Sequence, residues 1–259
     1  AITVYRKILE RDPPNIRALS ALASIYLARH QEKEAFAVLT KIREAAPDDI
    51  DIQLKVALIY YEAKHYDEAI EIFQKILTQH PQAERVLYYS GVIYENVKRD
   101  DEAIHQFMKL ASTSPFFKEA RLHSDYLHAR NHRGEAAIRL MKEAIREKPE
   151  EAAFYEYVAE LYSRERQHQE AVAVLRQGLK QTHSPESLYY SLGLVYERQG
   201  LIEEGVKSMR EVLKVNPDNA NALNYIGYTY ADHQMAGKLD EALLLLQKAL
   251  LLKPDDAYI

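Results

Sequence analysis

The 259-residue chain contains no cysteine and no tryptophan, and it has little glycine or proline. Without cysteine it cannot form a disulfide scaffold, a thiolate metal site or a cysteine nucleophile. Eight glycines and nine prolines are too few for a collagen-like chain, a flexible linker or an all-β chain dense in turns. The longest apolar run, Val56–Tyr61, is much shorter than the roughly 18 residues of a membrane-spanning helix. The first residues also lack the apolar segment of a signal peptide.

What the chain does contain is enough apolar surface for a core, because 47% of its residues are hydrophobic and 28% are charged. The net charge of -5 gives no electrostatic reason to expect binding to nucleic acid or to an anionic membrane. The aromatic residues are unevenly distributed, with 19 tyrosines against six phenylalanines. Tyrosine is therefore the residue type whose placement needs an explanation.

Proline sets a 34-residue period along the chain. Only one of the expected positions is not a proline, and the last step is 37 residues long because of a three-residue insertion near 233–238. The positions in order are Pro13, Pro47, Pro81, Pro115, Pro149, His183, Pro217 and Pro254. A period of this length predicts a repeat architecture.

Each period is predicted to contain two helices. In Ile50–Lys64 apolar residues recur every three or four positions, and a second helical stripe begins at about Tyr66. Small residues recur at one phase of the first helix and allow close approach of a second helix: Ala23, Ala57, Gly91, Ala159, Gly193 and Gly227. Three residues later come tyrosines that we interpret as packing residues with a polar tip: Tyr26, Tyr60, Tyr94, Tyr162, Tyr196 and Tyr230.

These small–aromatic pairs, the "DEA" or "KEA" that follows them and the closing proline resemble the tetratricopeptide repeat (TPR) family. The resemblance implies an all-α fold, a right-handed superhelical solenoid of antiparallel helix pairs. It covers seven repeats over residues 15–259, preceded by a lone second helix at 1–14. Because another first helix would start at residues 255–259, we expect the chain to be a fragment of a longer protein. The closing segment is similar to long bacterial TPR scaffold proteins, some of which are envelope lipoproteins.

The fourth repeat, about 118–149, departs from this pattern, because Asp125 replaces the small residue and His128 replaces the tyrosine. Two interpretations remain open at this stage. The repeat has either drifted, with looser packing, or it provides a hinge or a partner contact in the middle of the array.

The resemblance implies a non-enzymatic scaffold or adaptor whose first helices line a concave groove that binds a partner peptide or helix. Counting from the prolines places a tyrosine-rich set of side chains in that groove, and tyrosine suits peptide capture because it loses little entropy on ordering. The predicted partner-binding residues are Tyr61, Arg85, Tyr88, Tyr89, Asn96, Tyr126, Tyr157, Tyr190, Asn221, Asn224, Tyr225 and Tyr228. Neither the basic clamp of chaperone-tail binders nor an asparagine ladder is present on this face.

Other functions have weaker support. No nucleotide-binding, serine-hydrolase or zinc-protease motif occurs, so we expect no catalytic residue, no cofactor and no metal site. His128 and His132, four residues apart, could bind a divalent ion only if their helix continued that far. The main alternative is a regulatory or targeting arm of a larger multidomain enzyme or an envelope protease–adaptor assembly. RNA binding is a remote alternative, because the inner face is not basic. The uncapped ends could also pair in a homodimer.

Overall fold

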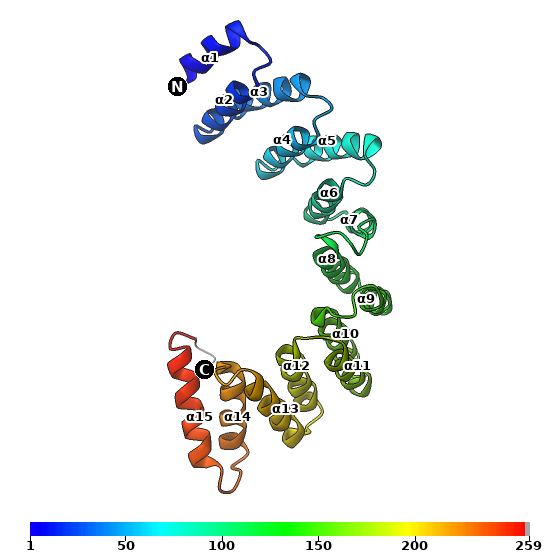
Figure 1. Ribbon diagram of the computed structural model, residues 1–259, viewed down its shortest axis with the longest axis vertical. Helices are drawn as coiled ribbons and strands as arrows, with labels where there is room; N and C mark the ends of the chain where they lie inside the picture. The colour runs from blue at the N-terminus through cyan, green and yellow to red at the C-terminus, as the bar shows by residue number, and fades with distance from the viewer. Residues whose placement is uncertain (257–259) are drawn as a thin grey trace. The chain divides into compact units, whose positions relative to one another are not determined.

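The computed structural model describes residues 1–256, in which all regular structure is helical. Consecutive helices pack side by side in pairs, and each pair has a first helix and a second helix (Figure 1). The first helices are α2 (Ile16–Ala28), α4 (Ile50–Glu62), α6 (Glu84–Asn96), α8 (Phe117–Arg130), α10 (Ala152–Arg164), α12 (Pro185–Arg198) and α14 (Ala220–Asp232). The second helices are α1 (Ile2–Arg11), α3 (Glu32–Ala45), α5 (Tyr66–Gln79), α7 (Asp100–Met108), α9 (Gly134–Glu147), α11 (His168–Gln181), α13 (Ile202–Val215) and α15 (Leu239–Leu252). The predicted all-α array of about seven helix pairs is confirmed.

The chain divides into two compact units, Ala1–Leu127 and His128–Ile259, and the division falls within α8. Each unit has an apolar core. In the first unit this core includes the fully buried rings of Phe73 and Phe107, and in the second unit it includes Met209. Two glycines at the small-residue phase lie against these side chains, because a Cβ on Gly91 would be 2.5 Å from the Phe107 ring and a Cβ on Gly193 would be 2.6 Å from Met209.

A left-handed residue ends the first helix of every repeat. The residues with positive φ, 34 positions apart, are His30, Lys64, Lys98, His132, Arg166, Gly200 and Gln234. The next amide donates to the carbonyl five residues earlier, as His65 does to Tyr60 at 2.8 Å. This is the Schellman arrangement that closes a helix on a residue in the αL region. Glycine is present at only one of these seven positions, so most of the turns are formed by residues that resist this conformation.

Second helices end against side chains of the following first helix. The Gln53 amide donates to the carbonyls of Arg43 and Ala46 at 3.0 and 2.8 Å, at the end of α3. The hydroxyl of Tyr155 on α10 donates to the carbonyl of Pro149 at 2.9 Å. These bonds satisfy carbonyls that have no partner within their own helix.

The equivalent side chain on α8 is Arg121, which is buried. Its guanidinium donates to the carbonyls of Phe107 and Leu110 at 3.1 and 3.2 Å and lies over the Phe117 ring. These bonds hold the end of α7, which stops at Met108 after nine residues where the other second helices from α3 onward have 14.

The tyrosines predicted to be structural join neighbouring repeats through their hydroxyl groups. In four cases the hydroxyl accepts a hydrogen bond from a residue 20 positions earlier, on the preceding second helix. These pairs are Arg6–Tyr26, Gln74–Tyr94, Arg176–Tyr196 and Arg210–Tyr230, with distances of 2.8 to 3.0 Å. Tyr162 instead lies under the ammonium of Lys142, also 20 residues earlier. For Tyr60, the residue 20 positions earlier is the uncharged Thr40, and the Tyr60 ring stacks on Phe36.

The drifted fourth repeat begins with a helix that is closely packed in the first unit. Ala120, Ser124 and Leu127 are fully buried, and Asp125 is 4% exposed. The looser packing expected for this repeat is therefore absent from α8. Of the two irregular residues, Asp125 is buried and His128 is partly buried.

The last helix has an apolar face that nothing covers among the described residues. Leu243 is 57% exposed, whereas Val206 at the equivalent position of α13 is 6% exposed. The insertion near 233–238 forms the turn before α15, and the further helix expected at 255–259 lies mostly outside the described residues. No helix within residues 1–256 has the length and apolar character needed to cross a bilayer.

Candidate functional site

All twelve predicted partner-binding residues lie on first helices, from α4 to α14. We call the surface that these residues occupy the first-helix face, and we describe it separately for each unit. The residues differ in how much of each side chain a partner could reach.

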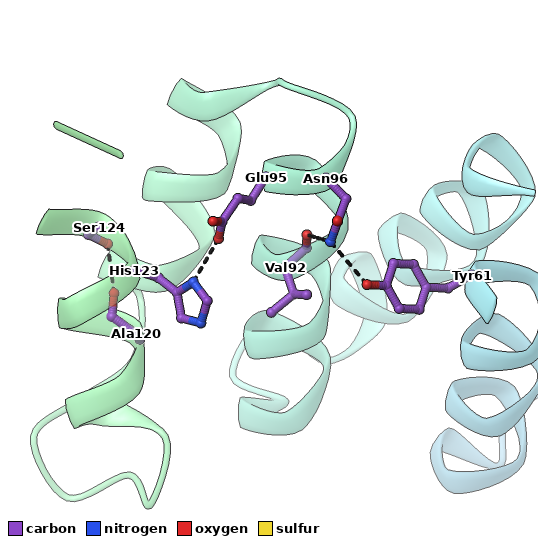
Figure 2. Close-up of polar contacts among 7 residues, drawn as sticks. All are labelled: Tyr61, Val92, Glu95, Asn96, Ala120, His123 and Ser124. Atoms are coloured by element: carbon purple, nitrogen blue, oxygen red, sulfur yellow. Dashed lines mark hydrogen bonds and ion pairs between the residues drawn. The ribbon is translucent and has the colours of Figure 1, made fainter. Parts of the chain in front are cut away.

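In the first unit, two polar contacts join α4 to α6 at opposite ends of the helices. The Asn96 amide donates to the hydroxyl of Tyr61 at 3.0 Å and to its own helix at the Val92 carbonyl (Figure 2). At the other end, Arg85 donates to Asp51 at 3.0 Å in a solvent-exposed ion pair. Burial raises the pKa of the Tyr61 hydroxyl, with Tyr66 adding to this effect, so Tyr61 remains a neutral hydrogen-bonding group.

Between these contacts, Tyr88 is mainly a packing residue. Its ring stacks on Phe116 with centroids 5.0 Å apart and also meets Phe107 and Tyr89. Burial raises its pKa. Both Tyr88 and Tyr89 are half-buried, so only part of each ring is accessible to a partner.

A histidine–carboxylate contact extends this face toward α8. The Nδ1 atom of His123 lies 2.7 Å from Oε2 of Glu95, and the imidazole stacks on Phe107 (Figure 2). His123 stands at the same position of its repeat as Tyr89, which lies 34 residues earlier in the chain. This pair was not predicted from the sequence, although the period places the two residues on consecutive first helices. Beyond it, Tyr126 is 53% exposed and presents its ring to solvent.

In the second unit, the first-helix face contains two adjoining hollows. One, of about 600 Å³, lies beside Glu156, His183 and Glu186. The other, of about 400 Å³, lies beside Asn224, Tyr225, Tyr228 and Lys253. Tyr190 and Asn221 line both hollows, so the two adjoin each other across α12 and α14, and we call them together the depression. Asn221 also accepts a hydrogen bond from Lys253 at 3.0 Å.

Tyr225 contributes its ring to this depression, but its hydroxyl is turned inward. The hydroxyl oxygen is buried without a hydrogen-bond partner among the described residues, and it lies 2.6 Å from where a Cβ of Gly205 would be. Burial, followed by the charges of Glu197 and Tyr190, raises the pKa of Tyr225 to about 12. Its hydroxyl is therefore a packing group, and only the ring can serve a partner.

A charged cluster lies on α10 and α12. Glu160 accepts hydrogen bonds from Arg198 at 2.7 Å and from Arg164 at 3.1 Å. Burial alone would raise the pKa of the Glu160 carboxyl, but the two arginines outweigh burial and hold it below its ordinary value. The carboxylate is thus charged and shared between two repeats.

Among the described tyrosines of the second unit, the most accessible are Tyr157 and Tyr228, which are 41% and 62% exposed. They flank the half-buried Tyr190 along the chain. The face therefore presents aromatic rings, amides and charges of both signs.

Metal binding has no support among the described residues, where no three histidine or acidic side chains lie close enough to hold an ion. Helix α8 ends at Arg130, and His132 has a φ of 57° in the turn that follows. His128 and His132 therefore do not lie one turn apart on a continuous helix, as binding of one ion by this pair would require.

Sequence models of the tetratricopeptide repeat match residues 1–59, residues 51–83, and residues 126–184 together with 190–257. No curated protein matches the chain. Proteins of this repeat family are generally scaffolds for protein–protein interaction.

Among solved structures, the chain is similar to a protein of the Cut9–Hcn1 hetero-tetramer of the APC/C. The two are 16% identical with a TM-score of 0.49, over 99% of this chain and 50% of the other, so this chain spans half of that protein's length. It is also similar to a TPR protein from Parabacteroides merdae, at 19% identity and a TM-score of 0.46 over 96% and 91% of the two chains. A third similar structure is a thermophilic TPR protein from Thermus thermophilus. It shows 18% identity and a TM-score of 0.45, over 69% and 97% of the two chains.

Proposed function

The chain belongs to the tetratricopeptide repeat family, and we propose that it is a non-enzymatic scaffold that holds a peptide segment or helix of a partner protein on its first-helix face. The observation that carries this proposal is the pair of adjoining hollows across α12 and α14, which share Tyr190 and Asn221. A partner segment lying there would cross successive repeats.

The chemistry of the depression supports a polypeptide partner. The exposed ring of Tyr228 in the second hollow provides apolar area at a low entropic cost, as does the exposed ring of Tyr157 on the neighbouring helix α10, and the amides of Asn221 and Asn224 can pair with a peptide backbone. Lys253 and Glu197 lie at the second hollow and bring charges of both signs. This mixture suits a segment with mixed polarity and gives no preference for a polyanion.

The proposal can be tested with peptides selected from a phage-displayed random library on the immobilised chain. Fluorescein-labelled copies of the selected peptides are then titrated by anisotropy against the wild type and against the double variant Tyr157→Ala/Tyr228→Ala. Because exposed aromatic anchors dominate such interfaces, we expect affinity to fall about tenfold or more. Circular dichroism should remain unchanged, because neither ring is buried.

Leu201→Ala is the matched control, because this side chain is 45% exposed in the same unit but lies in the turn before α13. It should bind every peptide as the wild type does. If the tyrosine double variant also retains full affinity for all selected peptides, the first-helix face of the second unit does not hold the partner.

A further inference from the structure

The first unit contains an apolar cleft that the predicted tyrosine set does not include. It has a volume of about 370 Å³ and lies between the consecutive first helices α2 and α4, above the second helix α3. Leu39 and Ile42 of α3 form its buried floor, and the half-buried Ile16, Ile52 and Ile59 form its walls. The cleft opens at Ser20 and Ser24, which are exposed.

The cleft exists because two small side chains stand where later repeats carry larger ones. At the phase of Ser24, the next two repeats have Leu58 and Val92, and at the phase of Ser20 they have Leu54 and Tyr88. In the first repeat, therefore, no side chain of α2 fills the space beside α4. A serine in this place removes apolar volume from the protein and leaves room for a side chain from elsewhere.

The serines do not make the opening polar. The hydroxyl of Ser24 donates to the carbonyl of Ser20 at 3.0 Å, within the same helix. The hydroxyl hydrogen of Ser24 is thus already used within α2. Since an apolar cavity gains free energy when an apolar group replaces water, the lining favours a hydrocarbon side chain.

Two charges at the rim restrict what can bind. Lys55 and Glu62 both line the cleft and lie on α4 seven residues apart, which is about 10 Å along the helix. Neither side chain forms an ion pair within residues 1–256. One end of the opening therefore offers an unpaired cation and the other an unpaired anion.

We propose that this cleft is an anchor site for one bulky apolar side chain of the partner segment, flanked by an acidic residue that pairs with Lys55 and a basic residue that pairs with Glu62. This inference rests on the proposed scaffold function and adds the sequence character of a segment that the first unit accepts. The anchor is leucine, isoleucine, methionine or phenylalanine, because only such residues fill the space between the isoleucine walls.

The test uses the full chain and peptides from the phage-displayed random library. Each selected peptide is titrated against wild type, Ser24→Leu and Ser24→Ala. The leucine variant fills the cleft with the residue type that α4 has at Leu58, whereas the alanine variant leaves the cleft open. We expect at least one peptide family with an apolar residue between acidic and basic neighbours to bind Ser24→Leu about tenfold or more weakly and Ser24→Ala unchanged.

A second measurement does not depend on the variants. The cleft is lined by Ile16, Ile52 and Ile59, so ¹³C-labelled isoleucine methyl groups of the wild-type chain report its occupation. The same peptide family should shift these three methyl signals, and peptides whose apolar residue is replaced by serine should not.

The outcomes separate this inference from the proposed function. If selected peptides lose affinity for Tyr157→Ala/Tyr228→Ala but bind Ser24→Leu normally and leave the cleft methyls unshifted, the anchor site is wrong and the scaffold function stands. If the library yields no binding peptide, both are overturned. If indole shifts the cleft methyls while no peptide does so, the cleft is a small-molecule site and the anchor proposal fails.

Discussion

The hydroxyl oxygen of Tyr225 lies 2.6 Å from the point that a Cβ atom on residue 205 would occupy. The other second helices from α3 onward carry alanine at this phase, at Ala35, Ala69, Ala103, Ala137, Ala171 and Ala242. Gly205 is therefore required by one tyrosine on the following helix. The same contact explains why a ring predicted to face a partner has a buried hydroxyl.

Gly205→Ala alone should destabilise the protein by about 1–3 kcal/mol, because the added methyl overlaps the Tyr225 hydroxyl. In a Tyr225→Phe background the nearest ring atom would be 3.6 Å from the new Cβ, an ordinary contact. The same substitution should then stabilise the protein by up to about 1 kcal/mol, since alanine is the better helix former. Urea unfolding of the wild type, Gly205→Ala, Tyr225→Phe and the double variant gives the coupling free energy between residues 205 and 225. Equal effects of Gly205→Ala in both backgrounds would contradict the contact.

Tyr225 should also make stability depend on alkaline pH. Its pKa is raised from 10.0 to about 12, so the folded state holds this proton more tightly than the unfolded chain does. The resulting stabilisation is complete below pH 10 and is lost as the pH rises through 12. Between these values the free energy of unfolding of Tyr225→Phe should therefore fall less steeply than that of the wild type. Parallel slopes in urea titrations at several pH values would rule this out.

The bond between Arg210 and Tyr230 predicts a difference between tyrosines at the same phase. Tyr230→Phe removes the acceptor of this bond and should cost about 1 kcal/mol of unfolding free energy. Tyr60→Phe is the matched control, because Thr40 takes the place of the arginine and bonds its own helix at Phe36. We expect this variant to be within about 0.5 kcal/mol of the wild type. The comparison requires only chemical denaturation, and equal losses would show that the arginine bond adds nothing.

The left-handed turns predict opposite effects of glycine and alanine. Lys64 has a φ of 64°, which costs an L-residue about 1–2 kcal/mol. Lys64→Gly should therefore stabilise the protein by about 0.5–1 kcal/mol after the entropy of glycine is counted. Gly200→Ala, at φ 74° in the equivalent turn, should destabilise it by a similar amount. Thermal unfolding of the two variants checks the sign, and a shift in the same direction for both would contradict this explanation.

The exposed leucines of α15 predict concentration-dependent self-association. Leu244 and Leu251 are 67% and 83% exposed and stand where α13 carries Lys207 and Lys214. Replacing both with lysine should change the free energy of unfolding by less than about 0.5 kcal/mol, because little buried surface is lost. Sedimentation velocity should show association of the wild type that the double variant lacks. A wild type that is monomeric at every concentration would refute the prediction.

The repeat period could be predicted from the sequence, because the small residues and tyrosines that fit two helices together must recur at the same phase. The left-handed turns could not be located in this way, since six of the seven turn residues are not glycine and only their positive φ angles reveal them. The early end of α7 was also hidden, because the partner of its carbonyls is Arg121, a charged residue on the next helix.

For the candidate site, the period correctly assigned residues to first helices but could not distinguish rings that face solvent from rings that fill gaps. Tyr88 and Tyr228 are both tyrosines at first-helix positions, yet one stacks on Phe116 and the other is 62% exposed. Which outcome occurs depends on neighbours from other repeats. The apolar cleft was invisible for the same reason, because it results from the absence of a large side chain at Ser20 and Ser24.

The bonds from Gln53 to the end of α3 and from Arg121 to the end of α7 are both donated backward along the chain. In each case a first helix completes the second helix that precedes it. Losing one repeat by local unfolding therefore removes the helix-end partners of its N-terminal neighbour and leaves the helix ends of its C-terminal neighbour satisfied. Within each unit, fraying should consequently spread more readily toward the N-terminus than toward the C-terminus. Local unfolding then has a preferred direction along the chain.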